Sequence, residues 1–337
     1  MQRSRRRTAA AVCTLAVAAV AAVLAGCSSP GTTSSAGSAS VLVPGTDATG
    51  GMPTGTGSTG TGGPCGGQPT VVVDGSTWDC VFDSEFSGTS LNSAQWAPVT
   101  TAASGYTAGP VACYVDSPAN ISVGGGYLSL TARAESAPFT CHSPLGDFST
   151  QYTSGTVATV GRFSLTYGRV DVRAKVPATA VPGLQSSFWL FPATQKVYGH
   201  WPTSGEIDIA ETYSQYPGVA IPYIHYSYDA STTNASTDTN VVTAYDCAID
   251  PDAFNDYVVE WTTSAITMEY DGRRCLVDHW VPAAPLSHPQ PFDLPFFLNL
   301  TQALGVGTNR FDPSSTPLPA TTEVQYVRVW QQAGAGQ

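Results

Sequence analysis

From residue 65 onward, hydrophobic and polar positions alternate with a period of two in a series of short runs. The clearest runs are residues 127–132, 168–176, 257–261, 265–270 and 324–330. Such alternation is typical of strands that bury one face, and Gly, Pro, Asn or Asp bounds each run. Asp271 and Gly272 directly follow one run, which is the signal of a tight hairpin. Because no long amphipathic helix is evident, we predict an all-β fold, a β-sandwich jelly roll of two antiparallel sheets.

The first 26 residues follow a different pattern. A basic start at residues 3–7 precedes an apolar run at residues 9–24 and two small residues before Cys27. This layout is typical of a secretory signal, and its end resembles a bacterial lipobox. We expect residues 1–26 to be a lipoprotein signal peptide and Cys27 to carry the lipid, so that an extracellular, cell-surface protein is anchored to the bacterial membrane. An uncleaved membrane-spanning anchor is the alternative, since the apolar run is long enough for one.

Residues 27–64 are mostly Gly, Ser, Thr and Pro. A segment with so little apolar surface cannot offset the entropy lost on ordering, so we expect a flexible linker. Residues 65–337 are then a single domain, of a length that is normal for a β-sandwich.

Six cysteines lie in this domain: Cys65, Cys80, Cys113, Cys141, Cys247 and Cys275. An even number in an exported chain predicts disulfides, although six cysteines allow fifteen connectivities. We favour sequence-local pairing, 65–80, 113–141 and 247–275, because each bond would close a short loop.

The charge balance narrows the class of partner. The chain has 14 Lys and Arg residues against 25 Asp and Glu residues, a net charge of -11. A nucleic-acid-binding protein needs a basic surface to displace counterions, and anionic lipid repels an acidic protein. We therefore exclude nucleic acid and expect membrane contact only through the N-terminal lipid. We also expect a monomer.

Three carboxylates gather within residues 206–211 of a chain in which only 12% of residues are charged. In a strand, Glu206 and Asp208 face the same side, whereas regular alternation would send Glu211 to the other side. A single β-bulge between Asp208 and Glu211 adds one residue and restores the common face. The pattern therefore predicts three carboxylates on one face of a bulged strand.

Like charges in a row destabilise a sheet face, so this cluster points to a function. Retaining glycoside hydrolysis uses two carboxyl groups, one as nucleophile and one as acid/base. Asp208 between them could hold a proton and hydrogen-bond the nucleophile, which would separate the titrations of the two glutamates. A calcium site or a solvated acidic strand is the alternative, although calcium ligands usually come from loops spaced by Gly and Asn.

The segment from Glu206 to Glu211 resembles the ExDxxE signature of family 16 glycoside hydrolases, in the bulge-containing form typical of laminarinase-like enzymes. The resemblance covers residues 80–331 and includes segments 82–96, 152–155, 167–170, 175–177, 188–190, 201–202, 271–272 and 326–330. It implies a jelly roll whose concave sheet forms a sugar-binding cleft. It also implies Glu206 as nucleophile, Glu211 as general acid/base and Asp208 as the assisting residue, with a covalent glycosyl-enzyme intermediate and net retention.

Five further residues are candidates for contact with the substrate. Trp201 and Trp189 offer flat aromatic faces for stacking on sugar rings, with a place in the core as the alternative. The resemblance favours stacking for Trp201, at the cleavage site, and similar enzymes place a histidine such as His225 near the acid/base. A structural role for His225 is the alternative. Arg169 could hydrogen-bond substrate or brace a carboxylate, and Gln302 is a further candidate for the cleft.

Relatives often bind a structural calcium through an Asp just before the final strand, where this chain has Gln325. We therefore expect no cofactor and assign no metal site. The expected function is endo-acting hydrolysis of a neutral polysaccharide, with β-1,3-glucan or mixed β-1,3-1,4-glucan favoured by the resemblance. A galactanase, a transglycosylase and a non-catalytic carbohydrate-binding or cell-wall-binding protein remain as alternatives.

Overall fold

The computed structural model describes residues 63–109, 111–194, 197–227 and 242–332. All of them belong to the compact unit Gly51–Gln337. The expected signal peptide, Cys27 and almost all of the expected linker lie outside the described residues. Within the described ranges the helices are short: α1 (Pro64–Gly67), α2 (Thr101–Ser104) and the 3₁₀ helix η2 (Gly307–Asn309). None of these helices has the length and apolar character needed to cross a membrane.

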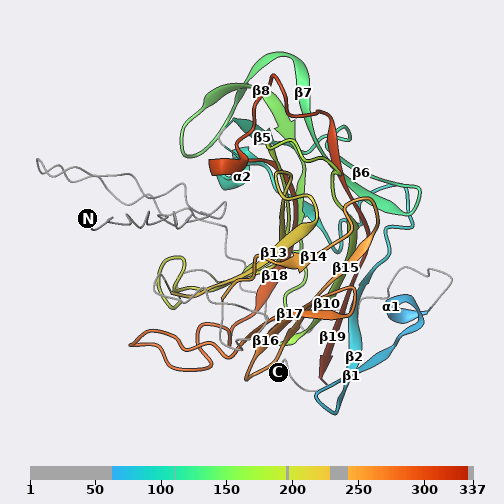
Figure 1. Cartoon of the computed structure of the whole chain (residues 1–337), viewed down its shortest axis with the longest axis vertical. Coiled ribbons are helices and arrows are strands. Elements are labelled where there is room, and N and C mark those ends of the chain that lie inside the picture. The colour runs from blue at the N-terminus through green and yellow to red at the C-terminus, as the bar shows by residue number, and fades with distance from the viewer. Residues whose placement is uncertain (1–62, 110, 195–196, 228–241, 333–337) are drawn as a thin grey trace, which may run out of the picture. The chain divides into compact units, whose positions relative to one another are not determined.

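The described residues form two β-sheets, which confirms the predicted jelly-roll sandwich (Figure 1). The smaller sheet has seven strands in the order β14 (Cys247–Ala248), β13 (Val219–His225), β12 (Glu206–Tyr213), β11 (Leu184–Pro192), β18 (Phe296–Leu304), β9 (Thr156–Ala158) and β3 (Ala97–Pro98). All six of its strand pairs are antiparallel.

The larger sheet has twelve strands among the described residues. Nine of them follow the order β17 (Arg273–Asp278), β16 (Ile266–Tyr270), β15 (Asn255–Trp261), β10 (Gly168–Lys175), β19 (Ala320–Gln332), β7 (Tyr127–Cys141), β8 (Phe148–Ser154), β5 (Ala112–Tyr114) and β4 (Thr107–Ala108). The other three are β1 (Thr70–Val73), β2 (Ser76–Ser84) and β6 (Ile121–Gly124), of which β2 pairs with β1 and β19, and β6 with β7. The pair β5–β8 is parallel.

The hydrophobic core lies between the two sheets. The ring of Phe188 on β11 packs against Tyr257 on β15, and Phe296 on β18 packs against Trp261 on β15, each with ring centroids 5.2 Å apart. Period-two alternation creates this core, because buried positions such as Val170 on β10 alternate with half-buried ones. The smaller sheet therefore has an inner face toward the core and an outer face away from it.

All five predicted strand segments and the predicted hairpin are confirmed. Each segment overlaps a strand: β7, β10, β15, β16 and β19 respectively. Tyr270 pairs with Arg273 across the turn, and Asp271 and Gly272 have φ values of 49° and 72°. Two positive φ values in succession are what a type I′ hairpin turn requires, and Gly takes the second without steric cost.

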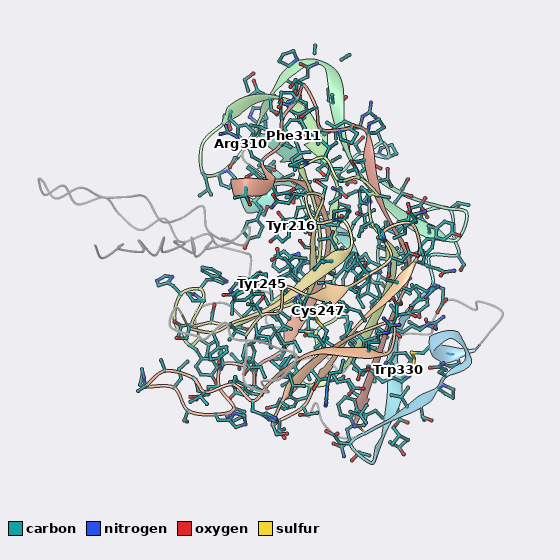
Figure 2. The ribbon with its side chains drawn as sticks, in the orientation of Figure 1. Tyr216, Tyr245, Cys247, Arg310, Phe311 and Trp330 are labelled. Atoms are coloured by element: carbon teal, nitrogen blue, oxygen red, sulfur yellow. A yellow bond between two sulfur atoms is a disulfide. The ribbon has the colours of Figure 1, made fainter. Side chains whose placement is uncertain are left out.

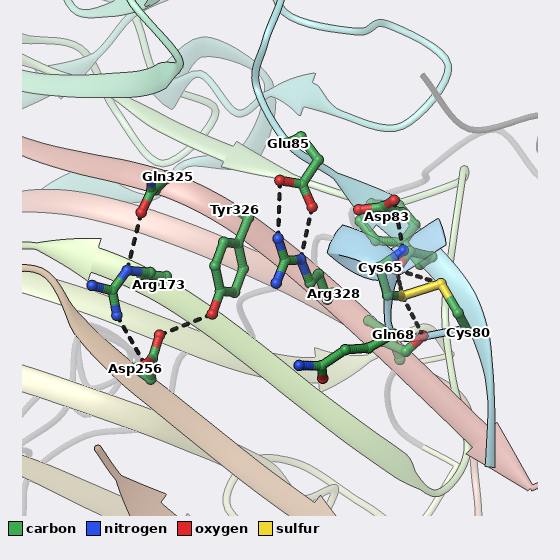
Figure 3. A network of polar contacts seen from close by, with 12 residues as sticks. Cys65, Gln68, Cys80, Asp83, Glu85, Arg173, Asp256, Gln325, Tyr326 and Arg328 are labelled. Atoms are coloured by element: carbon green, nitrogen blue, oxygen red, sulfur yellow. Dashed lines mark hydrogen bonds and ion pairs between the residues drawn. A yellow bond between two sulfur atoms is a disulfide. The ribbon is translucent and has the colours of Figure 1, made fainter. Parts of the chain in front are cut away.

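The predicted disulfide pairing is also confirmed. Cys65–Cys80 ties α1 to β2 (Figure 3), and Cys113–Cys141 ties β5 to β7 within the larger sheet. Cys247–Cys275 links β14 of the smaller sheet to β17 of the larger one, and Figure 2 labels Cys247 beside Tyr245 on the segment that enters β14. This third disulfide therefore joins the two sheets of the sandwich.

Candidate active site

The carboxylate cluster lies on β12, between β11 and β13. On the β13 side Asp208 pairs with Tyr223 and Glu211 pairs with Ile221, so three steps along β12 oppose two steps along β13. One extra residue between Asp208 and Glu211 is a β-bulge. The bulge predicted from the spacing of the acidic residues is therefore confirmed.

The bulge brings the three carboxylates to the outer face of the smaller sheet. Asp208 lies opposite Trp189, and Glu211 lies opposite Ser187, which is on the same side of β11. The intervening Ile207 and Ala210 belong to the core. The exposed fractions of Glu206, Asp208 and Glu211 are only 4%, 2% and 3%, so all three acids are buried.

Glu206 is the first residue of β12, and a tryptophan holds its carboxyl. Nε1–H of Trp201 donates a short hydrogen bond to Oε2 of Glu206. Gly205 precedes the strand with a φ of 87°, and a Cβ there would lie 2.9 Å from the ring of Phe296. Only glycine combines this φ with this close approach, so Gly205 lets the chain turn from Trp201 into β12.

Asp208 lies beside His225 of β13. Nε2 of His225 is 3.0 Å from Oδ2 of Asp208, although the two groups lack the alignment of a hydrogen bond. The His225 ring stacks on Tyr223 with centroids 4.0 Å apart and lies 5.1 Å from the Trp201 ring. Burial lowers the pKa of His225, which favours the neutral imidazole.

Glu211 is held by two residues that the sequence pattern did not single out. Nε2 of Gln185 on β11 donates to Oε1 of Glu211 at 2.7 Å, and the hydroxyl of Tyr213 donates to Oε2 at 2.8 Å. The sequence did contain a signal for Tyr213. Side chains two residues apart on a strand lie on the same face, so Tyr213 shares the face of Glu211 beyond the bulge. Gln185 could not be found in this way, because its contact depends on the register between β11 and β12.

Burial is the main cause of the electrostatics of this cluster. It raises the pKa of each of the three carboxyl groups, and the charge of Asp208 adds to the effect on both glutamates. The pKa of Glu211 reaches about 8, with the hydrogen bonds from Tyr213 and Gln185 acting in the opposite direction. The cluster therefore keeps protons near neutral pH, so a neutral carboxyl can lie beside an ionised one.

Three of the five predicted substrate-binding residues lie with the carboxylates. Trp201 and His225 contact Glu206 and Asp208 as described above. Trp189 lies on the outer face opposite Asp208, half-buried, with its Nε1 donating to the hydroxyl of Thr301 at 3.1 Å. None of the three is a core residue between the sheets, and their role in binding substrate stays a prediction.

Gln302 and Arg169 do not lie with the three acids of β12. Gln302 is 0% exposed and faces the core, where its Oε1 accepts hydrogen bonds from Ser186 and from Thr322 of the larger sheet. Alternate residues of a strand lie on the same face, so Gln302 faces the core together with Leu298 and Leu300. Arg169 lies on β10 of the larger sheet, where it forms ion pairs with Glu260 and Glu269. Neither side chain has a hydrogen bond or ion pair with the three acids of β12.

Gln325, where the resemblance noted in the sequence would place a calcium ligand, is engaged by a cation of the protein itself. Nε of Arg173 donates to Oε1 of Gln325 at 3.0 Å, and Nη1 of Arg173 donates to Oδ2 of Asp256 at 2.9 Å. Figure 3 draws both contacts. A guanidinium at this distance would repel a calcium ion, so these residues do not fit a metal ligand set. Across the described part of the chain, no group of three His, Cys, Asp or Glu residues could hold a metal ion.

A β-sandwich with two buried glutamates and an aspartate on one bulged strand has the site architecture of a glycoside hydrolase. The sequence matches the family described as "Glycosyl hydrolases family 16" over residues 116–277, which include all three acids. "Glucan endo-1,3-beta-glucosidase A1" of Niallia circulans is 32% identical over 268 residues, which are 75% of this chain and 38% of that protein. "Beta-glucanase" of Rhodothermus marinus is 32% identical over 226 residues, 63% of this chain and 70% of that protein.

A solved structure agrees with these matches. The laminarinase from Rhodothermus marinus aligns with a TM-score of 0.59 and 28% identity, covering 75% of this chain and 97% of that one. The chain therefore belongs to glycoside hydrolase family 16. It spans well under half the length of the Niallia protein.

Proposed function

We propose that the protein is an endo-acting β-glycoside hydrolase that cleaves internal bonds of a neutral β-glucan with retention of configuration, and that β-1,3-glucan is its preferred substrate. The observation that carries the proposal is the bulge of β12, which turns the carboxyl groups of Glu206 and Glu211 to one face. Separate donors hold the two groups. Trp201 donates to Glu206, whereas Gln185 and Tyr213 donate to Glu211. The two relatives, a glucan endo-1,3-beta-glucosidase of Niallia circulans and a beta-glucanase of Rhodothermus marinus, support the substrate class.

In the first step, ionised Glu206 attacks the anomeric carbon while protonated Glu211 gives its proton to the leaving glycosidic oxygen. The C–O bond to the leaving sugar breaks, and a glycosyl ester of Glu206 forms. Burial and the charge of Asp208 raise the pKa of Glu206, and the hydrogen bond from Trp201 offsets part of that rise in favour of the ionised form. Burial favours the protonated form of Glu211.

In the second step, Glu211 takes a proton from water, which attacks the anomeric carbon and releases Glu206. Two displacements on the same carbon restore the β configuration. Asp208 assists by holding a proton between the two glutamates, because burial disfavours a third negative charge there.

The surroundings of the acids suit an uncharged sugar polymer. Trp189 and Trp201 flank the cluster on the outer face and can stack on pyranose rings. A net charge of -11 would repel an anionic polysaccharide but not a neutral glucan.

We also propose that the protein is exported and anchored by a lipid on Cys27. The pattern of residues 1–27 supports this location, and so do the three disulfides, which persist in oxidising compartments outside the cytoplasm. Cys27→Ser should release the protein from membranes. Retention of this variant in the membrane fraction would favour the membrane-spanning anchor instead.

The activity is tested by reducing-end release from β-1,3-glucan, mixed-linkage β-glucan and galactan, with the full chain beside Glu206→Gln. Removal of a covalent nucleophile should lower the rate by at least about 10²-fold. Equal rates in both proteins would refute the assignment of Glu206. Binding without hydrolysis of any polymer would favour a carbohydrate-binding protein.

A further inference from the structure

The carboxyl of Glu211 has a separate buried donor for each of its oxygens. Gln185 donates to Oε1 and Tyr213 donates to Oε2, at 2.7 and 2.8 Å. The exposed fractions of Gln185 and Tyr213 are 1% and 6%, so bulk water does not compete for these bonds. The two-step reaction proposed above gives neither residue a part, although both touch the group that moves the proton.

We infer that Gln185 and Tyr213 are positioning residues that fix the carboxyl of Glu211 toward the leaving oxygen and favour its ionised form. The inference rests on the proposed function, because it assigns these residues to the acid/base of that reaction. The support is geometric: Gln185 lies directly opposite Tyr213 in the β11–β12 ladder. Two neighbouring strands therefore hold one side chain from two directions.

The reaction needs such a pair because Glu211 must change its protonation state twice. It gives up a proton in the first step and takes one in the second. Burial and the charge of Asp208 both oppose the ionised form, and they raise the pKa of Glu211 to about 8. Hydrogen bonds donated to a carboxylate favour the ionised form, so the two donors offset part of this effect.

Other titratable groups also interact electrostatically with Glu211, and they stay in place when a donor is removed. They are Glu206 and Asp208 on β12, Tyr223 and His225 on β13, Tyr245 before β14 and Tyr270 on β16. A change seen on removal of one donor is therefore due to that donor.

The kinetic test compares Tyr213→Phe and Gln185→Met in the full chain. Each variant loses one donor, so the alkaline limb of kcat/KM on β-1,3-glucan should move about one unit to higher pH. The kcat should fall about tenfold, since the base of the second step is then ionised less often and held less firmly. An aryl β-glucoside with an acidic phenol needs no proton from Glu211, so its kcat/KM should change little.

Tyr326→Phe is the matched control. It removes a tyrosine hydroxyl that donates to a carboxylate at 2.9 Å, but the acceptor is Asp256 of the larger sheet (Figure 3). Its pH limbs should stay in place. A loss of activity in Tyr213→Phe and Gln185→Met with unmoved limbs, and with equal losses on glucan and aryl glucoside, would show a merely structural role and overturn the inference.

A measurement that does not need activity separates this inference from the proposed function. Carbon-13 NMR of glutamate-labelled protein, assigned with Glu211→Gln, gives the pKa of Glu211 directly. A pKa about one unit higher in Tyr213→Phe supports the positioning role, even if the protein hydrolyses no glycan and the proposed function fails. An unchanged pKa in both folded variants overturns the inference, whatever the activity.

Discussion

The hydroxyl of Tyr270, on β16 of the larger sheet, crosses the core and donates a hydrogen bond to the backbone carbonyl of Ile209 at 2.8 Å. Ile209 lies within the bulge of β12, between Asp208 and Glu211, where the β13 ladder shifts register. A buried carbonyl without a partner destabilises a fold, so Tyr270 satisfies the group that the bulge exposes. The two sheets are thus coupled at the residue that sets the spacing of the acids.

Tyr270→Phe should therefore destabilise the bulge. We expect the free energy of unfolding to fall by about 1–3 kcal/mol, since the carbonyl of Ile209 loses its partner. Activity should fall as well, because Asp208 and Glu211 lose their fixed spacing. Chemical denaturation and kcat/KM measure both effects. The control is Tyr257→Phe, which removes a core hydroxyl that has no hydrogen-bond partner and should be neutral or stabilising. Equal effects of the two substitutions would contradict the role of Tyr270.

Trp201→Phe should move the acid limb of the pH profile. The indole donor favours the ionised form of Glu206, so its loss raises the pKa of that carboxyl. The acid limb of kcat/KM should shift upward by about one pH unit. Trp189→Phe removes an indole donor to Thr301 instead and should leave this limb in place. A limb that is unmoved in Trp201→Phe would count against the assignment of Glu206 as nucleophile.

The buried acids also predict how stability depends on pH. The pKa of Glu211 is raised from 4.5 to about 8 in the folded protein, so between these values the folded state binds more protons than the unfolded state. The free energy of unfolding must then fall as pH rises through this window, by up to about 1.4 kcal/mol per unit for one such group. Urea denaturation of Glu211→Gln between pH 5 and 8 should show a smaller fall.

Asp147→Asn is the control for this pH dependence. Hydrogen bonds from Ser143 and His142 lower the pKa of Asp147, so it is ionised in both states above pH 5 and adds no slope. The slope of this variant should match the wild type. Parallel curves for wild type and Glu211→Gln would show that Glu211 titrates normally, against the burial described above.

Two disulfides that close loops of equal length allow the effect of a disulfide on stability to be separated from its effect on activity. Cys113–Cys141 and Cys247–Cys275 each have a sequence separation of 28, so removal of either should cost about 3–4 kcal/mol in the chain-entropy description. Only the second joins the sheets, through β14, which pairs with the β13 neighbour of the acidic strand. Its double Ala variant should lower kcat/KM in the folded state, whereas the Cys113/Cys141 pair should not. A lower kcat/KM in the Cys113/Cys141 variant, with an unchanged kcat/KM in the Cys247/Cys275 variant, would contradict this coupling.

Much of the fold was predictable because it follows from local patterns. Alternation identified the strands, and the spacing of Glu206, Asp208 and Glu211 placed the bulge. Short loops between cysteines gave the disulfide pairing. These signals lie within segments of a few tens of residues, where chain geometry alone limits the possibilities.

The contacts of the site depend on what the sequence does not specify, namely which sheet a strand joins and how it is registered. Arg169 follows the alternation of β10, yet β10 belongs to the larger sheet, whereas Glu206, Asp208 and Glu211 lie on the smaller one. The side chain of Gln302 follows its strand's alternation into the core. Gln185 meets Glu211 only because β11 pairs with β12 in one register. The hydroxyl of Tyr270 reaches Ile209 across the sandwich, between residues that are 61 positions apart.

The central claim is that Glu206 and Glu211 act as nucleophile and acid/base on one face of the bulged strand. Proton NMR of the first products released from β-1,3-glucan tests it most directly, before the anomers interconvert. Two displacements at the anomeric carbon should give the β anomer first, with the α anomer appearing only later by mutarotation. An α anomer released first would mean a single displacement by water, and it would contradict the account.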